Sequence, residues 1–350
     1  MSTEIKLTQF SKGGGCGCKI APSVLQQIVQ TKNSSSFDQL LVGNESSDDA
    51  AVYQINNDEA IISTTDFFLP IVDDPFDFGR IAAANAISDV YAMGGNPLMA
   101  IAVLGFPIDK LPIEIAQQIL EGGRSVCAEA AIPLAGGHTI DSADPIYGLA
   151  VTGRVEIKNL KKNIGAKPGD VLFLTKPLGT GLLATALKRA LLLPEHYEPL
   201  INQMTTLNNI GIELGKINGV SAMTDVTGFG LLGHLIEMAE GSDVTMELTY
   251  TNILKMDGVD EYLKQRTIPD ATFRNWNSYS KKVQFAKGVN VMEAFNLLPD
   301  PQTNGGLLVA VAPNAVEQIK KLFINNGLGK HIEPIGMCVE KSDKPIRVNI

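Results

Sequence analysis

The sequence predicts an α/β (α+β) protein of two domains. Strand-like apolar runs alternate with helix-like segments along most of the chain, a pattern typical of folds in which helices cover a sheet. The chain has 350 residues, which exceeds the size of one ordinary hydrophobic core. Its apolar content of 45% and its few aromatic residues (6%) are typical of such proteins.

The first predicted domain covers residues 21–157. Its first helix is expected from the apolar stripe formed by Val24, Leu25, Ile28 and Val29. A long helix is expected to begin after Asp73-Asp74-Pro75 and to end before Gly94-Gly95, which are typical start and stop signals. In chain order, the expected elements are a helix over 22–31, strands over 50–55 and 60–65, helix 76–93, strand 98–106, helix 113–130 and strand 145–155.

The second predicted domain covers residues 171–350. Residues 158–170 are rich in Lys, Asn and Gly and contain Pro168, so this segment is the expected linker. The run Val171–Thr175 then begins a new series of alternating strands and helices that continues to residue 350. Residues 1–20 form a separate Gly- and Cys-containing arm, which we expect to be flexible.

Charge and apolar patterning exclude two classes of protein. A net charge of −9 argues against a general nucleic-acid binder, which needs a basic face. The longest apolar stretch, Leu98–Phe106, is too short to span a bilayer. The four cysteines lack paired spacing, and the first residues lack the apolar core of a signal peptide. We therefore expect a cytoplasmic protein in a reducing compartment.

The arm carries two thiols and an ammonium group on a glycine-rich backbone, Gly13-Gly-Gly-Cys-Gly-Cys-Lys19. We expect Lys19 to favour the thiolate form of Cys16 and Cys18. A zinc site is not favoured, because the sequence offers no second pair of ligands at the required spacing. A Cys16–Cys18 disulfide would close a strained ring. The segment also does not match the P-loop motif. An unstructured tail with incidental cysteines is the main alternative.

Carboxylates occur where predicted strands end and helices begin. Asp48 and Asp49 precede a strand, Asp66 ends the next strand, and Asp225 lies between a strand-like run and a helix. Asp89 follows Asn85 by four residues in the long helix, on the same face. Oxygen ligands without histidine suit Mg²⁺. Taken one at a time, such aspartates are more often helix caps or turn residues, but their recurrence where α/β proteins bind ligands favours a functional site.

Two glycine-rich segments are predicted to bind phosphate. Ala135-Gly-Gly-His-Thr139 is expected to be a turn whose backbone amides can bind phosphate oxygens, with an ordinary tight turn as the alternative. Gly228-Phe-Gly-Leu-Leu-Gly233 matches the dinucleotide fingerprint but lacks a clear ribose-binding acid, so it is weak evidence for NAD. His234 follows it as a packing residue or a phosphate neighbour. Cys127 and Cys338 are expected to be buried apolar residues.

Taken together, these motifs resemble the selenophosphate synthetase (selenide, water dikinase) family. The resemblance runs nearly from end to end, and the Cys-Gly-Cys-Lys arm is specific to that family within the aminoimidazole ribonucleotide synthetase-like superfamily. One small departure is Asn304, where serine is expected. The segments that carry the resemblance are residues 15–19, 40–52, 63–68, 85–89, 135–139, 224–234 and 300–308.

The resemblance implies the synthesis of selenophosphate from selenide, ATP and water, with release of AMP and orthophosphate. It implies two α/β domains with ATP in the cleft between them, and a homodimer whose N-terminal sheets join into a barrel. Several Mg²⁺ ions, K⁺ and a selenium-delivery protein are also expected. The implied roles are Cys16 and Lys19 in catalysis, Asp49, Asp89 and Asp225 as metal ligands, and Lys19, Asp48, Asp66, Asp89, Gly137, His138 and Thr139 around the nucleotide.

Two other functions remain open at this point. The chain could be a related ATP-dependent kinase or ligase of the same superfamily, although the thiol arm argues against it. It could also be a non-enzymatic selenium or metal carrier that uses Cys16 and Cys18. In that case the aspartates would be only caps and turn residues.

Overall fold

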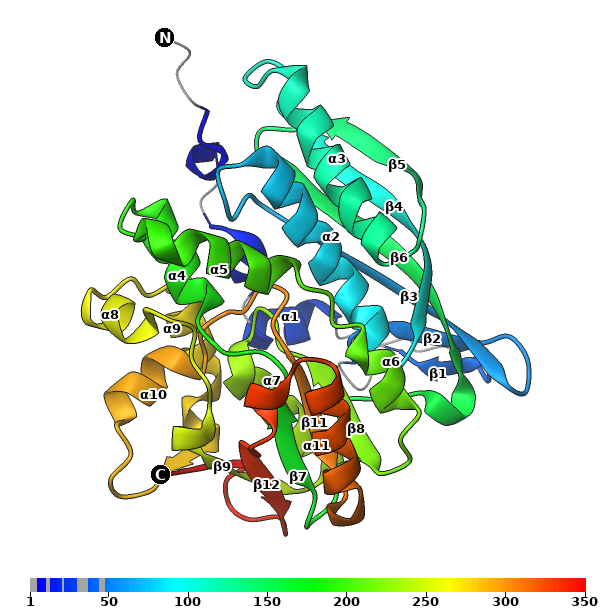
Figure 1. Cartoon of the computed structure of the whole chain (residues 1–350), viewed down its shortest axis with the longest axis vertical. Helices are drawn as coiled ribbons and strands as arrows, with labels where there is room; N and C mark the ends of the chain where they lie inside the picture. Colours follow the sequence, from blue (N-terminus) through cyan, green and yellow to red (C-terminus); the bar gives the residue numbers. More distant parts are fainter. Residues whose placement is uncertain (1–4, 11–12, 21, 30–36, 44–47) are drawn as a thin grey trace.

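The computed structural model describes residues 5–10, 13–20, 22–29, 37–43 and 48–350. Two sheets, each with its own helices, lie side by side, which confirms the predicted α/β (α+β) class (Figure 1). Within these ranges no helix is long and apolar enough to cross a membrane. The predicted end of the first helix at Thr31 lies outside the described residues.

The N-terminal sheet has six strands in the order β1-β2-β3-β6-β4-β5 among the described residues. All neighbouring strands in this order are antiparallel except β4 and β5, which run parallel. The strands are β1 (Leu40–Val42), β2 (Ala51–Gln54), β3 (Glu59–Phe68), β4 (Asn96–Phe106), β5 (Leu134–Asp141) and β6 (Ile146–Glu156). The helices of this half are α1 (Pro22–Val29), α2 (Pro75–Ala92) and α3 (Ile113–Glu129).

Helix α2 is the central element of the molecule. Its start follows the sequence signals, because Asp74 accepts a hydrogen bond from the Asp77 N–H and Pro75 occupies the first helical turn. Small residues fill most of its surface, so the helix packs against β3 and β6, against α3, and against α5 (Pro194–Thr205) and β8 (Val220–Asp225) of the other half. A helix buried on all sides can therefore carry functional groups into the boundary between the two halves.

The face of the N-terminal sheet away from α2 is apolar and exposed. Alternation along β3 places Ile62, Thr64 and Asp66 on the α2 side and leaves Phe67 on the opposite face. Large apolar side chains continue across this outer face on β2, β3, β4 and β5, each at least 41% exposed: Tyr53, Phe67, Leu98, Met99, Ile101 and Ile140. An exposed apolar area of this kind marks a surface for association.

The C-terminal sheet has seven strands in the order β10-β13-β9-β12-β7-β11-β8 within the described part of the chain. There, strand β8 pairs antiparallel with β11 alone, so the glycine-rich segment after β8 does not belong to a parallel dinucleotide-binding sheet. The remaining strands are β7 (Val171–Leu174), β9 (Thr245–Thr249), β10 (Val283–Phe285), β11 (Leu307–Val311), β12 (Gly336–Val339) and β13 (Ile346–Asn349).

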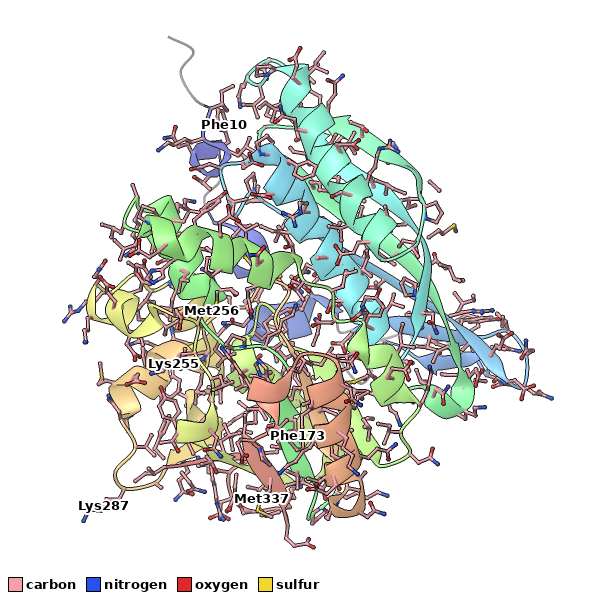
Figure 2. The ribbon with its side chains drawn as sticks, in the orientation of Figure 1. Phe10, Phe173, Lys255, Met256, Lys287 and Met337 are labelled. Atoms are coloured by element: carbon pink, nitrogen blue, oxygen red, sulfur yellow. The ribbon has the colours of Figure 1, made fainter. Side chains whose placement is uncertain are left out.

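Helices cover both faces of this sheet. Phe173 lies on the face covered by α11 (Val316–Asn325), where its ring centroid is 5.8 Å from that of Phe323 (Figure 2). The alternate residues Leu172 and Leu174 pack on the other face, with α7 (Gly230–Ser242). The other helices are α4 (Thr180–Lys188), α6 (Ile210–Gly215), α8 (Val259–Lys264), α9 (Asp270–Tyr279) and α10 (Val291–Leu297).

The prediction of a glycine-rich turn at residues 135–139 is wrong. These residues belong to β5, an exposed edge strand paired with β4. The pairing register shifts between Ala100 and Ala102, and a Cβ atom on Gly137 would lie only 2.3 Å from the Ala102 carbonyl oxygen. The glycine is therefore required for close strand approach rather than for a change in chain direction.

Candidate active site

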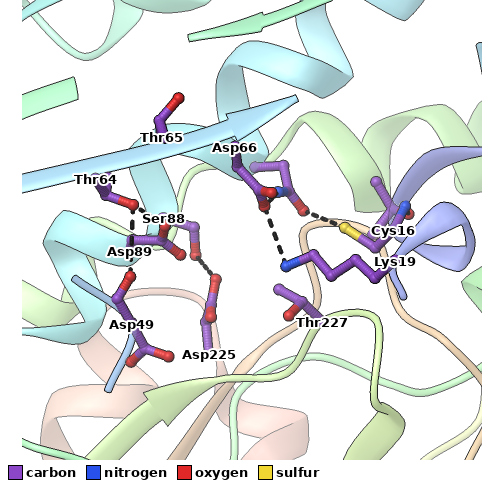
Figure 3. A network of polar contacts seen from close by, with 12 residues as sticks. Cys16, Lys19, Asp49, Thr64, Thr65, Asp66, Ser88, Asp89, Asp225 and Thr227 are labelled. Atoms are coloured by element: carbon purple, nitrogen blue, oxygen red, sulfur yellow. Dashed lines mark hydrogen bonds and ion pairs between the residues drawn. The ribbon is translucent and has the colours of Figure 1, made fainter. Parts of the chain in front are cut away.

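Polar side chains from both halves of the chain and from the arm converge beside α2 (Figure 3). Asp66 and Thr64 come from β3, and Asp49 lies just before β2. Asn85, Ser88 and Asp89 have helical spacings of three and four, which place them on one side of α2. The C-terminal half contributes Asp225, at the end of β8, and the loop of residues 300–304.

The arm is folded into this boundary. Cys16 is 1% exposed, and its N–H donates to Thr303 Oγ1 at 3.0 Å. Its Sγ lies 3.1 Å from Asn85 Oδ1. Gly15 has a φ of +51°, and a Cβ atom there would lie 2.5 Å from both Ile71 Cδ1 and Thr303 Oγ1. The described arm residues are therefore packed and not an unstructured tail.

The fingerprint glycines are explained by packing. A Cβ atom on Gly228 would lie 2.6 Å from the Cys16 carbonyl oxygen, so this glycine allows the arm backbone to approach. Gly230 has a φ of +70° and begins α7, and Gly233 contacts the ring of Tyr279. The segment 228–233 thus supports the arm and the first turn of α7.

The prediction that Lys19 makes Cys16 a thiolate is wrong for the arm in this position. Burial raises the pKa of the Cys16 thiol, and Asp66 and Asp225 raise it further. Lys19 lowers this pKa, but by less than burial raises it. Cys16 is therefore a protonated thiol that donates to the Asn85 amide oxygen.

Lys19 faces the same carboxylates. Its Nζ lies 3.4 Å from Asp66 Oδ2, and the lysine side chain is 36% exposed. Burial lowers the pKa of Lys19, but Asp66, Cys16, Asp89 and Asp225 raise it, and the net shift is upward. Lys19 therefore supplies a permanent positive charge beside the thiol.

The three predicted metal ligands lie within electrostatic reach of one another, each held by a hydroxyl group. Burial raises the pKa of Asp49, Asp89 and Asp225, and Asp225 also raises the pKa of the other two. The hydroxyl donors are Thr224 to Asp49 at 2.8 Å, Thr64 to Asp89 at 2.5 Å and Ser88 to Asp225 at 2.5 Å. Across the described residues, no three His, Cys, Asp or Glu side chains form a group that could hold a metal by themselves.

The remaining predicted residues are distributed differently. Asp48 Oδ1 accepts from the Asn163 N–H at 2.7 Å, which ties the loop before β2 to the segment between the sheets. Gly137, His138 and Thr139 are exposed on β5, three strand positions away from β3 in the sheet order. Within one chain, the fold therefore does not bring these three residues to the carboxylates.

Comparison with known proteins agrees with this arrangement. The family models for the N-terminal and C-terminal domains of AIR synthase related proteins match residues 47–155 and 167–349. Selenide, water dikinases of Photorhabdus laumondii, Pseudomonas putida and Yersinia pseudotuberculosis are 52%, 53% and 55% identical to the chain. Each alignment covers at least 99% of both proteins. The chain belongs to the selenide, water dikinase family.

Solved structures outside the selenide, water dikinase family share the fold. Thiamine-monophosphate kinase from Stenotrophomonas maltophilia has a TM-score of 0.64 at 19% identity, covering 89% of this chain and 92% of its own. The hydrogenase maturation protein HypE from E. coli has a TM-score of 0.63 at 20% identity, covering 82% of each chain. At such identities the likeness shows the fold alone.

In this selenide, water dikinase family member, Asn85 has a part that was not predicted from the sequence, and His234 has the packing role that was one of its two expected roles. Asn85 Nδ2 donates to Asp66 Oδ2 at 2.5 Å, while its Oδ1 accepts from Cys16 and from the Asn304 N–H at 2.7 Å. The sequence signal for Asn85 is an amide side chain in a helix otherwise made mostly of small and apolar residues. His234 Nε2 accepts from the Thr227 N–H at 3.1 Å, so it supports the segment after Asp225.

Proposed function

We propose that the chain is a selenide, water dikinase that makes selenophosphate from selenide and ATP. The γ-phosphoryl group passes to selenium, and hydrolysis of the remaining β-phosphate by water yields AMP and orthophosphate. The observation that carries this proposal is the position of Cys16. The arm places the Cys16 thiol and the Lys19 ammonium group at the carboxylate-lined boundary between the two AIR synthase-related domains.

We assign Cys16 and Lys19 to catalysis. The Cys16 thiol is soft and shielded from water, which suits it to receive or guide selenide. The Lys19 ammonium group lies beside the carboxylates. From there it could stabilise the negative charge on the oxygens of the transferred phosphoryl group. Because Cys16 is 1% exposed, a reactive selenium species held at its thiol would be shielded from bulk solvent.

The carboxylate cluster suits magnesium. Asp49, Asp89 and Asp225 offer only oxygen donors, and Asp49 Oδ2 is buried without a hydrogen-bond partner among the described residues. Such carboxylates need cations to remain charged when they are buried. We propose these three residues as Mg²⁺ ligands; bound Mg²⁺ would neutralise the charge of the ATP phosphates. K⁺ is a further proposed requirement, without an assigned site.

We propose that the chain consists of an arm (residues 1–20), a first domain (21–157), a linker (158–170) and a second domain (171–350). We infer that ATP binds between the two domains. Asp48, Asp66 and Asp89 would face the nucleotide from one chain. Gly137, His138 and Thr139 on β5 would take part only if a second copy lies against the exposed sheet face. We therefore propose a homodimer in which the two N-terminal sheets form a barrel.

The free thiols and the selenide substrate also indicate where the protein works in the cell. All four cysteines are free, and three of them are buried. A free-thiol enzyme that handles selenide requires a reducing environment, so we propose that the protein is cytoplasmic. A selenium-delivery protein is a proposed partner for the same reason.

Replacing Cys16 by Ser tests the proposed role of the thiol. We expect selenide-dependent formation of AMP to be lost, because the hydroxyl is a poor substitute for a soft sulfur atom, while Mg-ATP binding is retained. Turnover would be followed anaerobically by nucleotide chromatography and binding by calorimetry. Cys127→Ser is the matched control, since Cys127 is also buried but lies on α3. Normal turnover by Cys16→Ser would contradict the assignment.

A further inference from the structure

A second hollow lies on the other side of the arm. It has a volume of about 400 Å³ and is bounded by the arm, the end of α4, the start of α9 and the loop of residues 300–304. The arm contributes Gly13, Gly14 and Gly17 to its wall. None of the carboxylates of the proposed ATP site lines it.

The hollow is basic. Lys188, Arg189 and Arg274 line it, and among the described residues Asp270 is the single carboxylate in its lining. The Arg189 guanidinium donates to the Arg266 and Ile268 carbonyl oxygens, which are neutral partners. This charge pattern is the opposite of that on the Cys16 side, where aspartates dominate.

The two arm thiols are directed to different sides. Cys16 is turned toward Asn85 and the carboxylates. Cys18 is partly exposed. Its Sγ lies beside Gly13: a Cβ atom added to Gly13 would be 3.1 Å from it. Burial raises the pKa of Cys18, while Leu69, Lys188 and Arg274 lower it, so the hollow's cations act on this thiol. Cys18 does not line the hollow itself, but its Sγ lies directly beside Gly13, which does.

The hollow and the active site share one wall. Thr303 lines the hollow, and its Oγ1 accepts the Cys16 N–H at 3.0 Å. Arg274 Nη2 donates to the Gly17 carbonyl oxygen at 2.8 Å, which fixes the same short turn of the arm. The hollow therefore reaches Thr303, whose hydroxyl group contacts the Cys16 backbone directly.

We propose that this hollow binds hydrogen selenide, the anionic selenium substrate, before it reaches Cys16. The inference rests on the proposed function. The carboxylate side, with Asp49, Asp66, Asp89 and Asp225, is where Mg²⁺ and the ATP phosphates would bind, whereas the basic hollow stays open to an anion and attracts it. Cys18 places a soft thiol, which suits selenium, beside the wall of the same hollow.

Charge reversal at Lys188 tests the proposal kinetically. For Lys188→Glu we expect the KM for selenide to rise by roughly threefold or more, because three cations against one carboxylate in the lining would become two of each. The KM for ATP should stay nearly constant. Lys321→Glu on α11, which does not line the hollow, is the matched control and should change neither constant. An unchanged selenide KM in Lys188→Glu would overturn the proposal, as would an equal rise in both constants.

A selenium-free measurement separates this proposal from the proposed function. Alkylation of Cys18 would be followed by mass spectrometry with anionic iodoacetate and with neutral iodoacetamide. We expect the iodoacetate-to-iodoacetamide rate ratio to exceed that of free glutathione and to fall by roughly threefold in Lys188→Glu. An equal ratio in the wild type and the variant would overturn the basic hollow as an anion site. A wild type without selenide-dependent turnover would instead overturn the proposed function, and hydrogen selenide as the ligand with it.

Discussion

Asn85 is the residue through which the arm, β3 and the 300–304 loop are connected. Its side chain is fully buried, and both ends of the amide are used. The amide fixes the direction of the Cys16 thiol and of the Asp66 carboxylate at the same time. We regard Asn85 as a positioning residue, because it acts on the reacting groups through its neighbours.

Replacing Asn85 by Ala should release the thiol. We expect selenide-dependent turnover to fall by roughly tenfold to a hundredfold, since small displacements of reacting groups have effects of that size. Alkylation of Cys16 should become faster than in the wild type, which a general loss of stability would not produce selectively. Thr267→Ala, another fully buried polar residue, is the control. Unchanged Cys16 reactivity in Asn85→Ala would show that Asn85 does not position the thiol.

Asp300 predicts a pH dependence of stability. It is fully buried in the loop of residues 300–304, where its carboxylate accepts from N–H groups in the first turn of α4. Burial raises its pKa to about 8, although Gln302 and the Leu182 and Gly181 N–H groups lower it. Because the folded pKa lies above the unfolded one, its contribution to stability is complete at low pH. That contribution is lost as the pH rises toward 8.

The Asp300→Asn variant isolates this effect. As the pH rises from about 5 to about 8, the wild type should lose unfolding free energy relative to Asp300→Asn. The loss should be at most about 1.4 kcal/mol per pH unit. Urea unfolding at several pH values measures it. A difference that does not vary with pH would show that Asp300 is already ionised in the folded protein.

At the scale of elements, α2 and α3 are held unusually close together. A Cβ atom on Gly79 of α2 would lie 1.9 Å from the Ile119 carbonyl oxygen, and one on Gly122 of α3 would lie 2.0 Å from the Phe76 carbonyl oxygen. Two glycines on facing helices thus set the distance between their backbones. This contact fixes the helix that carries Asn85, Ser88 and Asp89.

Replacing Gly122 by Ala should force the two helices apart. We expect a loss of about 1 to 3 kcal/mol in the free energy of unfolding, because the helix propensity of Ala does not offset a backbone clash. Chemical denaturation measures the loss. Gly329→Ala, where an added Cβ atom meets nothing within 4 Å, should be nearly neutral. Equal stability of both variants would contradict the close-packing account.

The sequence was a good guide to elements with local signals and a poor one to β5. The predicted limits of α2 were within one residue of the observed ones, because Asp74, Pro75 and Gly94 act locally. The segment Ala135–Thr139 has the glycines of a turn, yet pairing with β4 makes it a strand. That pairing depends on tertiary contacts, which a local pattern does not contain.

At the scale of the whole molecule, the exposed face of the N-terminal sheet predicts a dimer. Ile101 is 44% exposed near the middle of this face. Ile101→Glu should produce a monomer in light scattering, because a buried unpaired charge opposes association. The variant should also lose turnover, since β5 would no longer meet a second copy. Ile324→Glu, 56% exposed on α11, is the control. A dimeric Ile101→Glu protein would place the interface elsewhere.

The sequence indicated several of the side chains that gather at the candidate site, but not the contacts between them. Carboxylates at the ends of predicted strands were enough to indicate Asp49, Asp66 and Asp225. The contacts that organise them are long-range: Cys16 meets Thr303 across 287 residues of sequence and Asn85 across 69. Such contacts follow from the packing of two domains and an arm, so no local motif reports them. The buried, protonated state of Cys16 has the same origin.

The measurement that tests the central claim most directly is phosphorus NMR of the wild-type protein. The protein would be incubated anaerobically with Mg²⁺, K⁺ and ATP, with and without selenide. The account predicts a selenium-coupled phosphorus signal together with AMP and orthophosphate, and only when selenide is present. Formation of ADP alone, or no consumption of ATP, would contradict it. The first result would favour a related kinase of the superfamily, and the second a carrier that binds through Cys16 and Cys18.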